Sequence, residues 1–409
     1  MKIGLLAYHA ACNFGATLQL LSTYMFLKKN GHQPIILNWV AKDLEELYKN
    51  SVPKAQYACQ KKVRQSIWHE TELVHNNEEI VRIIKEEELE AVIIGSDAVA
   101  QHHPFLERLT FPCRTIVGVQ GTTSDTQYPN PFWATWLSDL SQPIPVALIS
   151  VSNQDSAFRL IPRATRKAMD KSIACYSYVS VRDSWTQQMF AYLTGGKCIP
   201  PITPDPVFAF NQNAASLLPE KSELTKRHQL PEKYILLSFL PTAHPSVSQD
   251  WIDEFSVIAK TNGIECFLLP FSHNASFGRQ PHTIDLPLSP LEWYALIKYS
   301  QGYVGNNMHP IVVSLHNNIP FFSFDNYGTP HLNGLYVNEA SSKIKHILEA
   351  GGFAEQRTGL TSRWSKAPHP KEVFRKLQMF DHTKCLSFAD SQLNCYNRMM
   401  TDVMKHIAP

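Results

Sequence analysis

Residues 2–39, KIGLLAYHAACNFGATLQLLSTYMFLKKNGHQPIILNW, decide the fold class of this chain. The apolar run at 3–8 predicts a strand, and residues 16–29 predict a helix because apolar side chains recur there every three to four positions. Asn30-Gly31 ends this helix, and residues 35–39 predict a second strand. A strand, a helix and a strand in this order are typical of a parallel sheet, so the sequence predicts an α/β fold.

The same alternation returns along the rest of the chain. Further strands are expected at 91–94, 115–119, 145–150, 178–182, 234–239, 265–269, 303–305 and 320–324, and further helices at 77–90, 131–140, 155–172, 248–262, 290–300, 340–350, 368–380 and 390–406. Prolines gather in residues 200–233, which show little periodicity and are assigned to the interdomain linker. The predicted domains are 1–210 and 230–380, followed by a helical segment, 381–409, that packs back on the first domain.

The composition indicates a large globular protein. A chain of 409 residues has room for about two to four domains of roughly 100–200 residues. Hydrophobic residues make up 44% of the chain and charged residues 18%, which excludes wholesale disorder. Because the formal net charge is only +2, and dedicated nucleic-acid binders are usually strongly basic, no nucleic-acid partner is expected.

The cysteines and the N-terminus favour a cytoplasmic protein. The eight cysteines include no C-x-x-C pair and are expected to be reduced thiols. His69, His75 and the pair at 102–103 lack matching ligands, so neither a metal site nor a cofactor is predicted. The first eight residues are too short for a signal peptide, and no apolar stretch reaches the roughly 18 residues needed to span a membrane.

The first loop that can carry function is 9–15. Loops at the carboxyl ends of parallel strands hold the functional residues of such sheets, and a ligand between two such domains is the default expectation. This loop opens a helix whose free N–H groups can receive an anion, which makes Asn13 and Gly15 candidate binding residues. Alternatively, Asn13 only caps the helix and Gly15 only permits close packing. No G-x-G-x-x-G or G-K-[ST] motif supports a dinucleotide or P-loop site.

Two further strand ends carry charged residues. Gly95-Ser96-Asp97 follows an apolar run, and Asp97 can either orient a substrate hydroxyl and take its proton or merely cap a helix. Arg182 follows another strand and can clamp a carboxylate or phosphate through two parallel hydrogen bonds, or else form a surface pair with Asp183. Ser184 is expected to open the next helix.

The segment Asn306-Asn307-Met308-His309-Pro310 joins a predicted strand to a helix. Pro310 is tolerated in the first turn of a helix because its missing N–H is not needed there. His309 is then aimed at the cleft, where it can bind or protonate a phosphate-bearing ligand. The alternative is a histidine that is only hydrogen-bonded within the protein.

Taken in order, these motifs resemble those of one family. The series is NFGATLQ at 13–19, GSD at 95–97, SVRD at 180–183, Asp205-Pro206, Ser289-Pro290, and Asn306, Met308 and His309. Spread over about residues 1–330, it resembles the polysaccharide pyruvyl transferase family. The resemblance implies two Rossmann-like domains in a GT-B-type arrangement with a cleft between them.

The resemblance also implies an activity. Members of the family transfer pyruvate from phosphoenolpyruvate to two hydroxyls of a sugar, forming a cyclic ketal, in the synthesis of bacterial exopolysaccharides and capsules. It implies that Arg182 holds the donor, that His309 binds its phosphate or acts as an acid, and that Asp97 engages the acceptor. The implied substrate-binding residues are Asn13, Gly15, Ser96, Ser184, Asn306 and Asn307.

The acceptor and the place of action follow from the same resemblance. The acceptor sugar is expected on a lipid or a nucleotide carrier, with the first domain holding the acceptor side and part of the donor site. The expected location is the bacterial cytoplasm, with the inner face of the membrane as the site of action on a lipid-linked acceptor. Arg159, Arg163 and Arg166 share one helical face, which is either a solvated surface or a contact for such an anionic carrier.

Departures from the family pattern keep two alternatives open. Many members have Gln and Trp where this chain has Ala98 and Ala100, Arg or Ser in place of Asn307, and Gly in place of Pro310. One alternative is a GT-B glycosyltransferase that uses a nucleotide sugar, because a fold does not decide a function. The other is a binding protein of the same fold that has lost catalysis.

Overall fold

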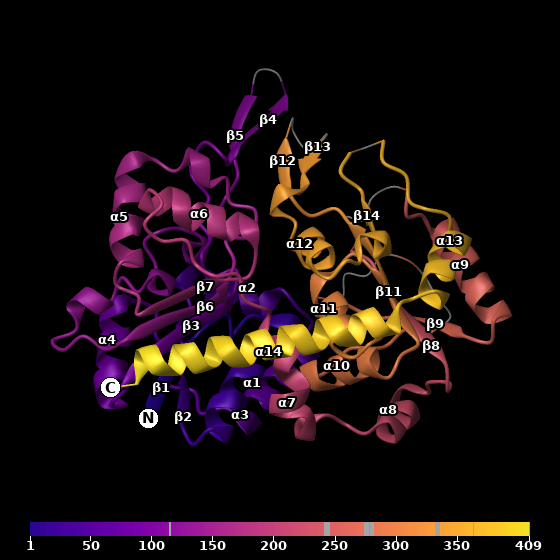
Figure 1. Cartoon of the computed structure of the whole chain (residues 1–409), viewed down its shortest axis with the longest axis horizontal. Coiled ribbons are helices and arrows are strands. Elements are labelled where there is room, and N and C mark those ends of the chain that lie inside the picture. Colours follow the sequence, from indigo (N-terminus) through magenta and orange to yellow (C-terminus); the bar gives the residue numbers. More distant parts are fainter. Residues whose placement is uncertain are drawn as a thin grey trace.

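Two five-stranded sheets organise the chain, one in each half (Figure 1). The computed structural model describes residues 1–113, 116–240, 246–273, 278, 282–331, 336–362 and 364–408. The N-terminal sheet has the order β2-β1-β3-β6-β7, with β1 Lys2–Leu6, β2 Gln33–Ile36, β3 Ala91–Asp97, β6 Val146–Val151 and β7 Tyr178–Val181. The C-terminal sheet has the order β14-β11-β10-β8-β9, with β8 Tyr234–Ser238, β9 Glu265–Leu268, β10 Gly302–Gly305, β11 Phe321–Asp325 and β14 Arg357–Gly359.

Every strand pair in the two sheets is parallel, which confirms the α/β expectation. The helices are α1 Phe14–Lys29, α2 Lys42–Asn50, α3 Lys54–Ile67, α4 Asn77–Glu86, α5 Arg163–Ile173, α6 Ser184–Thr194, α7 Phe210–Ala214, α8 Lys221–His228, α9 Gln249–Thr261, α10 Pro290–Lys298, α11 Met308–His316, α12 Lys343–Ala350, α13 Pro370–Gln378 and α14 His382–Ile407. Short 3₁₀ turns lie at Ser124–Thr126, Pro131–Trp133, Leu137–Asp139, Phe158–Leu160, Pro206–Ala209, Ala215–Leu217, Glu339–Ser341 and Ala354–Gln356.

Helix α1 lies between the two halves. Most of its residues are buried on every side, because it covers the N-terminal sheet and also contacts α10 of the C-terminal half. Phe14, its first residue, stacks on Trp293 of α10 with ring centroids 5.4 Å apart. The first turn of α1 is therefore held at the junction of the two halves.

The structure departs from three local expectations, and one of them, the helix at 131–140, was wrong. The strand expected at 115–119 is β5 Ile116–Val119, which pairs antiparallel with β4 Leu109–Cys113 in a separate hairpin; Thr115 lies outside the described residues. Residues 131–140 form two short 3₁₀ turns because Ala134 adopts a left-handed conformation, with φ of 50°. Residues 200–233, assigned to the linker, contain α7 and α8, and Phe208 among them is buried; their role as the interdomain linker stays a prediction.

Three features were not expected in their observed form. β14 adds an edge strand to the C-terminal sheet, and β12 Thr329–His331 pairs with β13 Tyr336–Asn338 in a second hairpin. α14 begins at residue 382, earlier than predicted, and crosses both halves (yellow in Figure 1). Cys385 Sγ donates to Leu315 O of α11 at 3.2 Å, and Met399 Sδ lies 3.2 Å from Ser150 Oγ of β6. The domain boundaries 1–210, 230–380 and 381–409 stay a prediction.

Candidate active site

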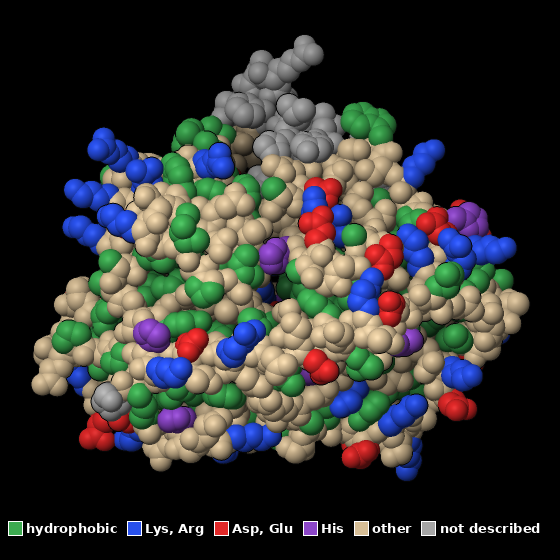
Figure 2. Space-filling view, in the orientation of Figure 1, with side chains coloured by type: hydrophobic (Ala, Val, Ile, Leu, Met, Phe, Trp, Pro, Cys, Tyr) green, Lys and Arg blue, Asp and Glu red, His purple; other side chains and the backbone are tan. Residues whose placement is uncertain are grey.

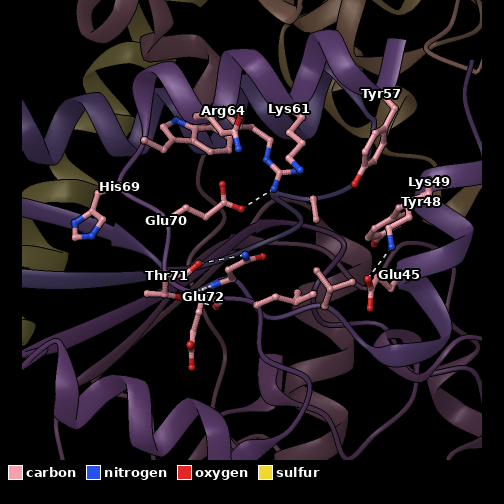
Figure 3. A pocket seen from close by; sticks show the side chains of 16 residues that line it. Glu45, Tyr48, Lys49, Tyr57, Lys61, Arg64, His69, Glu70, Thr71 and Glu72 are labelled. Carbon is pink, nitrogen blue, oxygen red and sulfur yellow. Dashed lines mark hydrogen bonds and ion pairs between the residues drawn. The ribbon is translucent and has the colours of Figure 1, made fainter. Parts of the chain in front are cut away.

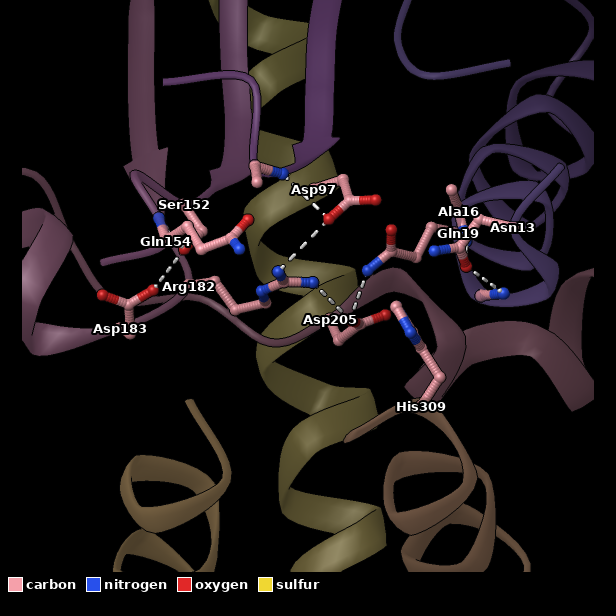
Figure 4. Close-up of polar contacts among 12 residues, drawn as sticks. Asn13, Ala16, Gln19, Asp97, Ser152, Gln154, Arg182, Asp183, Asp205 and His309 are labelled. Atoms are coloured by element: carbon pink, nitrogen blue, oxygen red, sulfur yellow. Dashed lines mark hydrogen bonds and ion pairs between the residues drawn. The ribbon is translucent and has the colours of Figure 1, made fainter. Parts of the chain in front are cut away.

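A cavity of about 180 Å³ lies between the carboxyl ends of the N-terminal strands and the helices of the C-terminal half (Figure 4). Asn13, Asp97, Arg182, Asn307 and His309 line it together, although they come from segments far apart in sequence. Functional residues of parallel sheets gather at this edge because all their strands end there. The structure thus brings five of the nine predicted site residues to one cavity.

Asn13 and Gly15 shape the start of α1. Asn13 Oδ1 accepts hydrogen bonds from Gly15 N at 2.9 Å and Ala16 N at 3.2 Å, so Asn13 caps the helix. A Cβ atom on Gly15 would lie 2.1 Å from His309 Cγ, so only glycine fits beside that ring. The structure shows the capping and packing roles, and substrate binding by these two residues stays a prediction.

Arg182 is buried at the end of β7, with its side chain 5% exposed. Its Nη1 donates to Asp205 Oδ2 at 2.8 Å, and its Nη2 lies 3.6 Å from Asp97 Oδ1. Its Nε and Nη2 have no hydrogen-bond partner among the described residues. These two atoms form one edge of the guanidinium group, so a planar pair of N–H donors is left for a carboxylate or phosphate.

Asp183 does not pair with Arg182, so the surface-pair alternative was wrong. Its Oδ1 accepts from Thr186 N and Oγ1, both at 2.7 Å, and its Oδ2 accepts from Ser152 Oγ at 2.9 Å. Asp183 thereby caps α6, which begins at Ser184 as expected. Ser184 is not among the described residues that line the cavity, and its predicted substrate contact stays untested.

The turn after β3 is tightly constrained. Gly95 has φ of +114°, and a Cβ atom there would lie 2.5 Å from Ile149 O, so the position requires glycine. Asp97 is also left-handed, with φ of 78°, and its Oδ1 accepts from Ala98 N at 2.8 Å. Ser96 is 2% exposed, and its Oγ has no hydrogen-bond partner among the described residues. This backbone directs the Asp97 carboxylate into the cavity.

The charges around Asp97 keep it ionised. Burial by itself would raise the pKa of Asp97, but Arg182, Lys343 and His309 hold it below its ordinary value. The pKa of Arg182 is raised, because the attraction of Asp205 and Asp97 outweighs the effect of burial. The cavity therefore contains a fixed carboxylate beside a fixed guanidinium group.

His309 enters the cavity from the first turn of α11. Asn307 caps this helix, and its Oδ1 accepts from His309 N at 3.4 Å. His309 Nε2 is buried and has no hydrogen-bond partner among the described residues, so the alternative of an internally bonded ring was wrong for this atom. Burial lowers the pKa of His309, and this effect outweighs the attraction of Asp205 and Asp97, which raises it. The ring is therefore neutral near pH 7.

Asn306 precedes this helix and is 2% exposed. Its Oδ1 accepts from Leu240 N at 3.1 Å, which ties the loop after β10 to the end of β8. Its Nδ2 has no hydrogen-bond partner in the part of the chain that the structure describes. Asn306 holds two strand ends together, and a substrate contact through Nδ2 stays a prediction.

Lys343, the first residue of α12, was not predicted as a site residue. Lys343 lines the cavity, and its ammonium group has no ion pair or hydrogen bond with any described residue. Burial, with the charge of Arg182, lowers the pKa of Lys343 to about 8. A cation in the first turn of a helix opposes the helix dipole, and this was the one signal in the sequence that could have revealed it.

Ala98 and Ala100, which replace polar and aromatic residues of the family, lie in the core instead of the cavity. They are 5% and 3% exposed. Arg159, Arg163 and Arg166 do not line the cavity either. Figure 2 shows Lys and Arg side chains gathered at the upper left, over α5. Arg159 and Arg163 are exposed there, and Arg166 lies 5.0 Å from the ring centroid of Tyr192.

Two kinds of feature are not found in the described residues. No helix there has the length and apolar character that crossing a membrane requires. No group of three or more His, Cys, Asp or Glu side chains is arranged to hold a metal ion in the same residues.

The sequence model of the polysaccharide pyruvyl transferase family matches residues 13–327. The chain belongs to this family. The match starts at Asn13, the cap of α1, and ends at Tyr327, another residue of the cavity wall. Lys343 therefore lies outside the matched segment. No curated protein sequence matches the chain.

Solved structures similar to this pyruvyl transferase family member confirm its GT-B-type arrangement of two Rossmann-like domains. UDP-GlcNAc 2-epimerase from Neisseria meningitidis, bound to UDP-GlcNAc, is 8% identical, with a TM-score of 0.56 over 99% of this chain and 100% of that one. Arabidopsis thaliana UGT89C1, complexed with UDP-L-rhamnose, is 8% identical, with a TM-score of 0.52 over 99% of each chain. S. aureus MnaA with UDP is 10% identical, with a TM-score of 0.50 over 96% of this chain and 92% of that one. At these identities the likeness concerns the fold alone.

Proposed function

We propose that this protein transfers the pyruvyl group of phosphoenolpyruvate to two hydroxyls of a sugar, forming a cyclic ketal during bacterial surface polysaccharide synthesis. Membership of the family supports the transferase class. The observation that carries the donor assignment is one edge of the Arg182 guanidinium group: its buried Nε and Nη2 have no hydrogen-bond partner in the described structure, and the nearest carboxylate, Asp97 Oδ1, lies 3.6 Å from Nη2. A buried pair of N–H donors without acceptors calls for an anionic ligand.

The donor has two anionic groups, and the cavity offers a partner for each. The Arg182 edge fits the carboxylate, because two parallel N–H donors match its two oxygens. Lys343 and His309 Nε2 serve the phosphate, since both line the cavity and neither has an internal partner for that nitrogen in the described residues. Phosphate binding raises the pKa of His309 and so favours its protonated form.

In the proposed reaction, C2 of phosphoenolpyruvate exchanges its phosphate for two sugar oxygens. A proton adds to C3 of phosphoenolpyruvate, which becomes a methyl group and leaves C2 electrophilic. One sugar hydroxyl then forms a C–O bond to C2, with its proton directed towards Asp97. The second hydroxyl bonds to C2 as the bond from C2 to the phosphate oxygen breaks. The two hydroxyls release two protons in all: one balances the proton gained at C3, and the other leaves with the phosphate. Protonated His309 is the acid that delivers a proton to the departing phosphate.

The acceptor sugar is carried on a lipid diphosphate or on a nucleotide, and the reaction takes place in the cytoplasm. With a lipid-linked acceptor, the protein works at the inner face of the membrane as a peripheral protein. Two exposed arginines, Arg163 at the start of α5 and Arg159 in the 3₁₀ turn before it, favour contact with an anionic carrier.

Calorimetric titration of phosphoenolpyruvate tests the donor assignment before the acceptor is known. Arg182→Lys keeps the charge beside Asp205 but removes the paired donors, and His309→Gln removes the acid. Each change is expected to weaken donor binding by about tenfold or more, which corresponds to one charge-assisted hydrogen bond. Arg163→Lys, on exposed α5, is the matched control and is expected to bind as the wild type does.

A panel of UDP-sugars titrated in parallel separates the alternatives. Binding of a UDP-sugar without binding of phosphoenolpyruvate would overturn the proposal in favour of a glycosyltransferase. If all variants bind phosphoenolpyruvate as tightly as the wild type does, Arg182 and His309 do not contribute to donor binding. Wild-type protein that binds neither ligand would favour a family member that has lost catalysis.

A further inference from the structure

A second, larger cavity lies beside α2 and α3 of the N-terminal half (Figure 3). Its volume of about 700 Å³ falls within the range typical of ligand sites. Tyr48 and Lys49 of α2 face Tyr57, Lys61 and Arg64 of α3 across it, and Figure 3 shows the loop with Glu70 and Thr71 closing one side. None of the residues that line this cavity also lines the 180 Å³ cavity.

Most charges in this cavity are already neutralised by neighbours. Arg64 Nη2 lies 2.5 Å from Glu70 Oε1, and Lys49 Nζ lies 2.8 Å from Glu45 Oε1. Among the cavity's lysine and arginine side chains, Lys61 has no ion pair with a described residue. Because the pairs offset one another, the walls offer many hydrogen-bonding atoms with little net charge, which favours a neutral polar ligand over an anion.

Two buried donors on the wall need acceptors. Trp68 is 7% exposed, and its Nε1 has no hydrogen-bond partner among the described residues. Arg64 Nε is likewise buried and without a partner there. An unpaired buried N–H costs about 1–3 kcal/mol, so a ligand that supplies oxygen acceptors gains from contacting it.

Aromatic rings accompany these polar groups. Tyr48 and Tyr57 add two rings to the indole of Trp68 on the cavity lining. Rings of this kind offer rigid contact area together with a hydroxyl or N–H group. A pyranose ring combines C–H groups on its faces with hydroxyls at its edge, so it matches walls that alternate aromatic and hydrogen-bonding surface.

The cavity adjoins the candidate active site through the loop after β1. Ala10 of that loop lines the larger cavity, and Asn13 of the same loop lines the smaller one. His9, which directly precedes Ala10, is buried, and its Nε2 lies 2.8 Å from Asn38 Oδ1 and 3.5 Å from Glu70 Oε1 of the larger cavity. One chain segment thus forms a wall of both cavities.

We propose that the cavity between α2 and α3 binds a neutral sugar residue of the acceptor, next to the residue that receives the pyruvyl group. This inference rests on the proposed function for the role of the sugar, but the binding itself can be tested without it. A site of this kind lets the enzyme select an acceptor by a sugar that does not react. The energy of that contact then positions the reacting hydroxyls at Asp97.

Saturation-transfer NMR with the methyl glycosides of glucose, galactose, mannose and N-acetylglucosamine tests the proposal. At least one glycoside is expected to bind the wild type in the millimolar range. Trp68→Phe removes only the indole N–H, and Tyr57→Ala removes a ring from the lining; each is expected to weaken binding at least fivefold. Lys62→Ala is the matched control, since Lys62 is exposed on α3 and does not line the cavity.

The outcomes separate this inference from the proposed function. Absence of binding by all four glycosides, or equal binding by all variants, would overturn the sugar site. Binding of inorganic pyrophosphate that is lost in Lys61→Ala would also overturn it, because the cavity would then be an anion site. Phosphoenolpyruvate titrated into the same variants is expected to bind as in the wild type. If the wild type binds a glycoside but does not bind phosphoenolpyruvate, the proposed function is overturned and the sugar site is still supported.

Discussion

Gly15 and His309 touch across the two halves of the protein, and their contact requires glycine at position 15. A Cβ atom there would lie 2.1 Å from Cγ of the His309 ring. Gly15 is in the first turn of α1, and His309 is in the first turn of α11, so two helix N-termini meet at the cavity. The positive ends of both helix dipoles thus face the space where the proposed donor binds.

Gly15→Ala is expected to push His309 out of place. The added methyl group overlaps the ring, and relief of such overpacking typically costs about 1–3 kcal/mol. We therefore expect a lower free energy of unfolding and phosphoenolpyruvate binding that is at least about tenfold weaker. Urea denaturation and calorimetry measure the two effects. Gly121→Ala is the control, because a Cβ atom at Gly121 meets nothing within 4 Å; equal behaviour of the two variants would contradict this account.

Asp205→Asn is expected to destabilise the protein strongly. The Asp205 side chain is fully buried and pairs with Arg182 at 2.8 Å, so the change leaves a buried guanidinium group without its main charge partner. Loss of one partner of a buried pair typically lowers the free energy of unfolding by about 3–5 kcal/mol. The exposed pair of Asp402 and Lys405 provides the control, and Asp402→Asn is expected to change the free energy of unfolding by less than about 1 kcal/mol. Urea denaturation curves that match for the two variants would refute the buried pair.

Donor binding is expected to weaken as the pH rises through the lowered pKa of Lys343. Lys343 is charged below about 8 and neutral above it, so the attraction for phosphate is lost on the alkaline side. Calorimetry between about pH 7 and pH 9 is expected to show this loss in the wild type and not in Lys343→Arg, whose guanidinium stays charged. Lys345→Arg, on the same helix and paired with Glu339, is expected to keep the wild-type profile. A flat wild-type profile would remove Lys343 from the donor site.

His309 is expected to make folding sensitive to acid. Burial lowers its pKa in the folded state, so the unfolded chain takes up this proton at a higher pH than the folded chain does. The stability contributed by the neutral ring is therefore present above the ordinary value of about 6.5 and falls as the pH falls below it. His309→Gln is expected to reduce the loss of unfolding free energy between about pH 7.5 and pH 5. An undiminished loss in urea denaturation would contradict a buried, neutral His309.

Local patterns were enough to predict the framework of the fold. The strand, helix and strand of residues 2–39 form β1, α1 and β2, because apolar spacing records which faces are buried. The prediction at 131–140 was wrong because composition cannot show that Ala134 turns left-handed and breaks the helix. The hairpin containing β5 was missed because an apolar run does not reveal which strand it pairs with.

The sequence by itself determined that the chain is an α/β protein of two domains, and it determined the order of motifs that marks the family. It also placed Asp97, Arg182 and His309 at the ends of strands, since parallel sheets bring such ends together. Only the tertiary structure decided that Asp205 pairs with Arg182 and that Lys343 completes the cavity. The pair joins two segments of the N-terminal half and Lys343 comes from the C-terminal half, so the distances and burial that set the pKa of Arg182 and of Lys343 exist only in the packed structure.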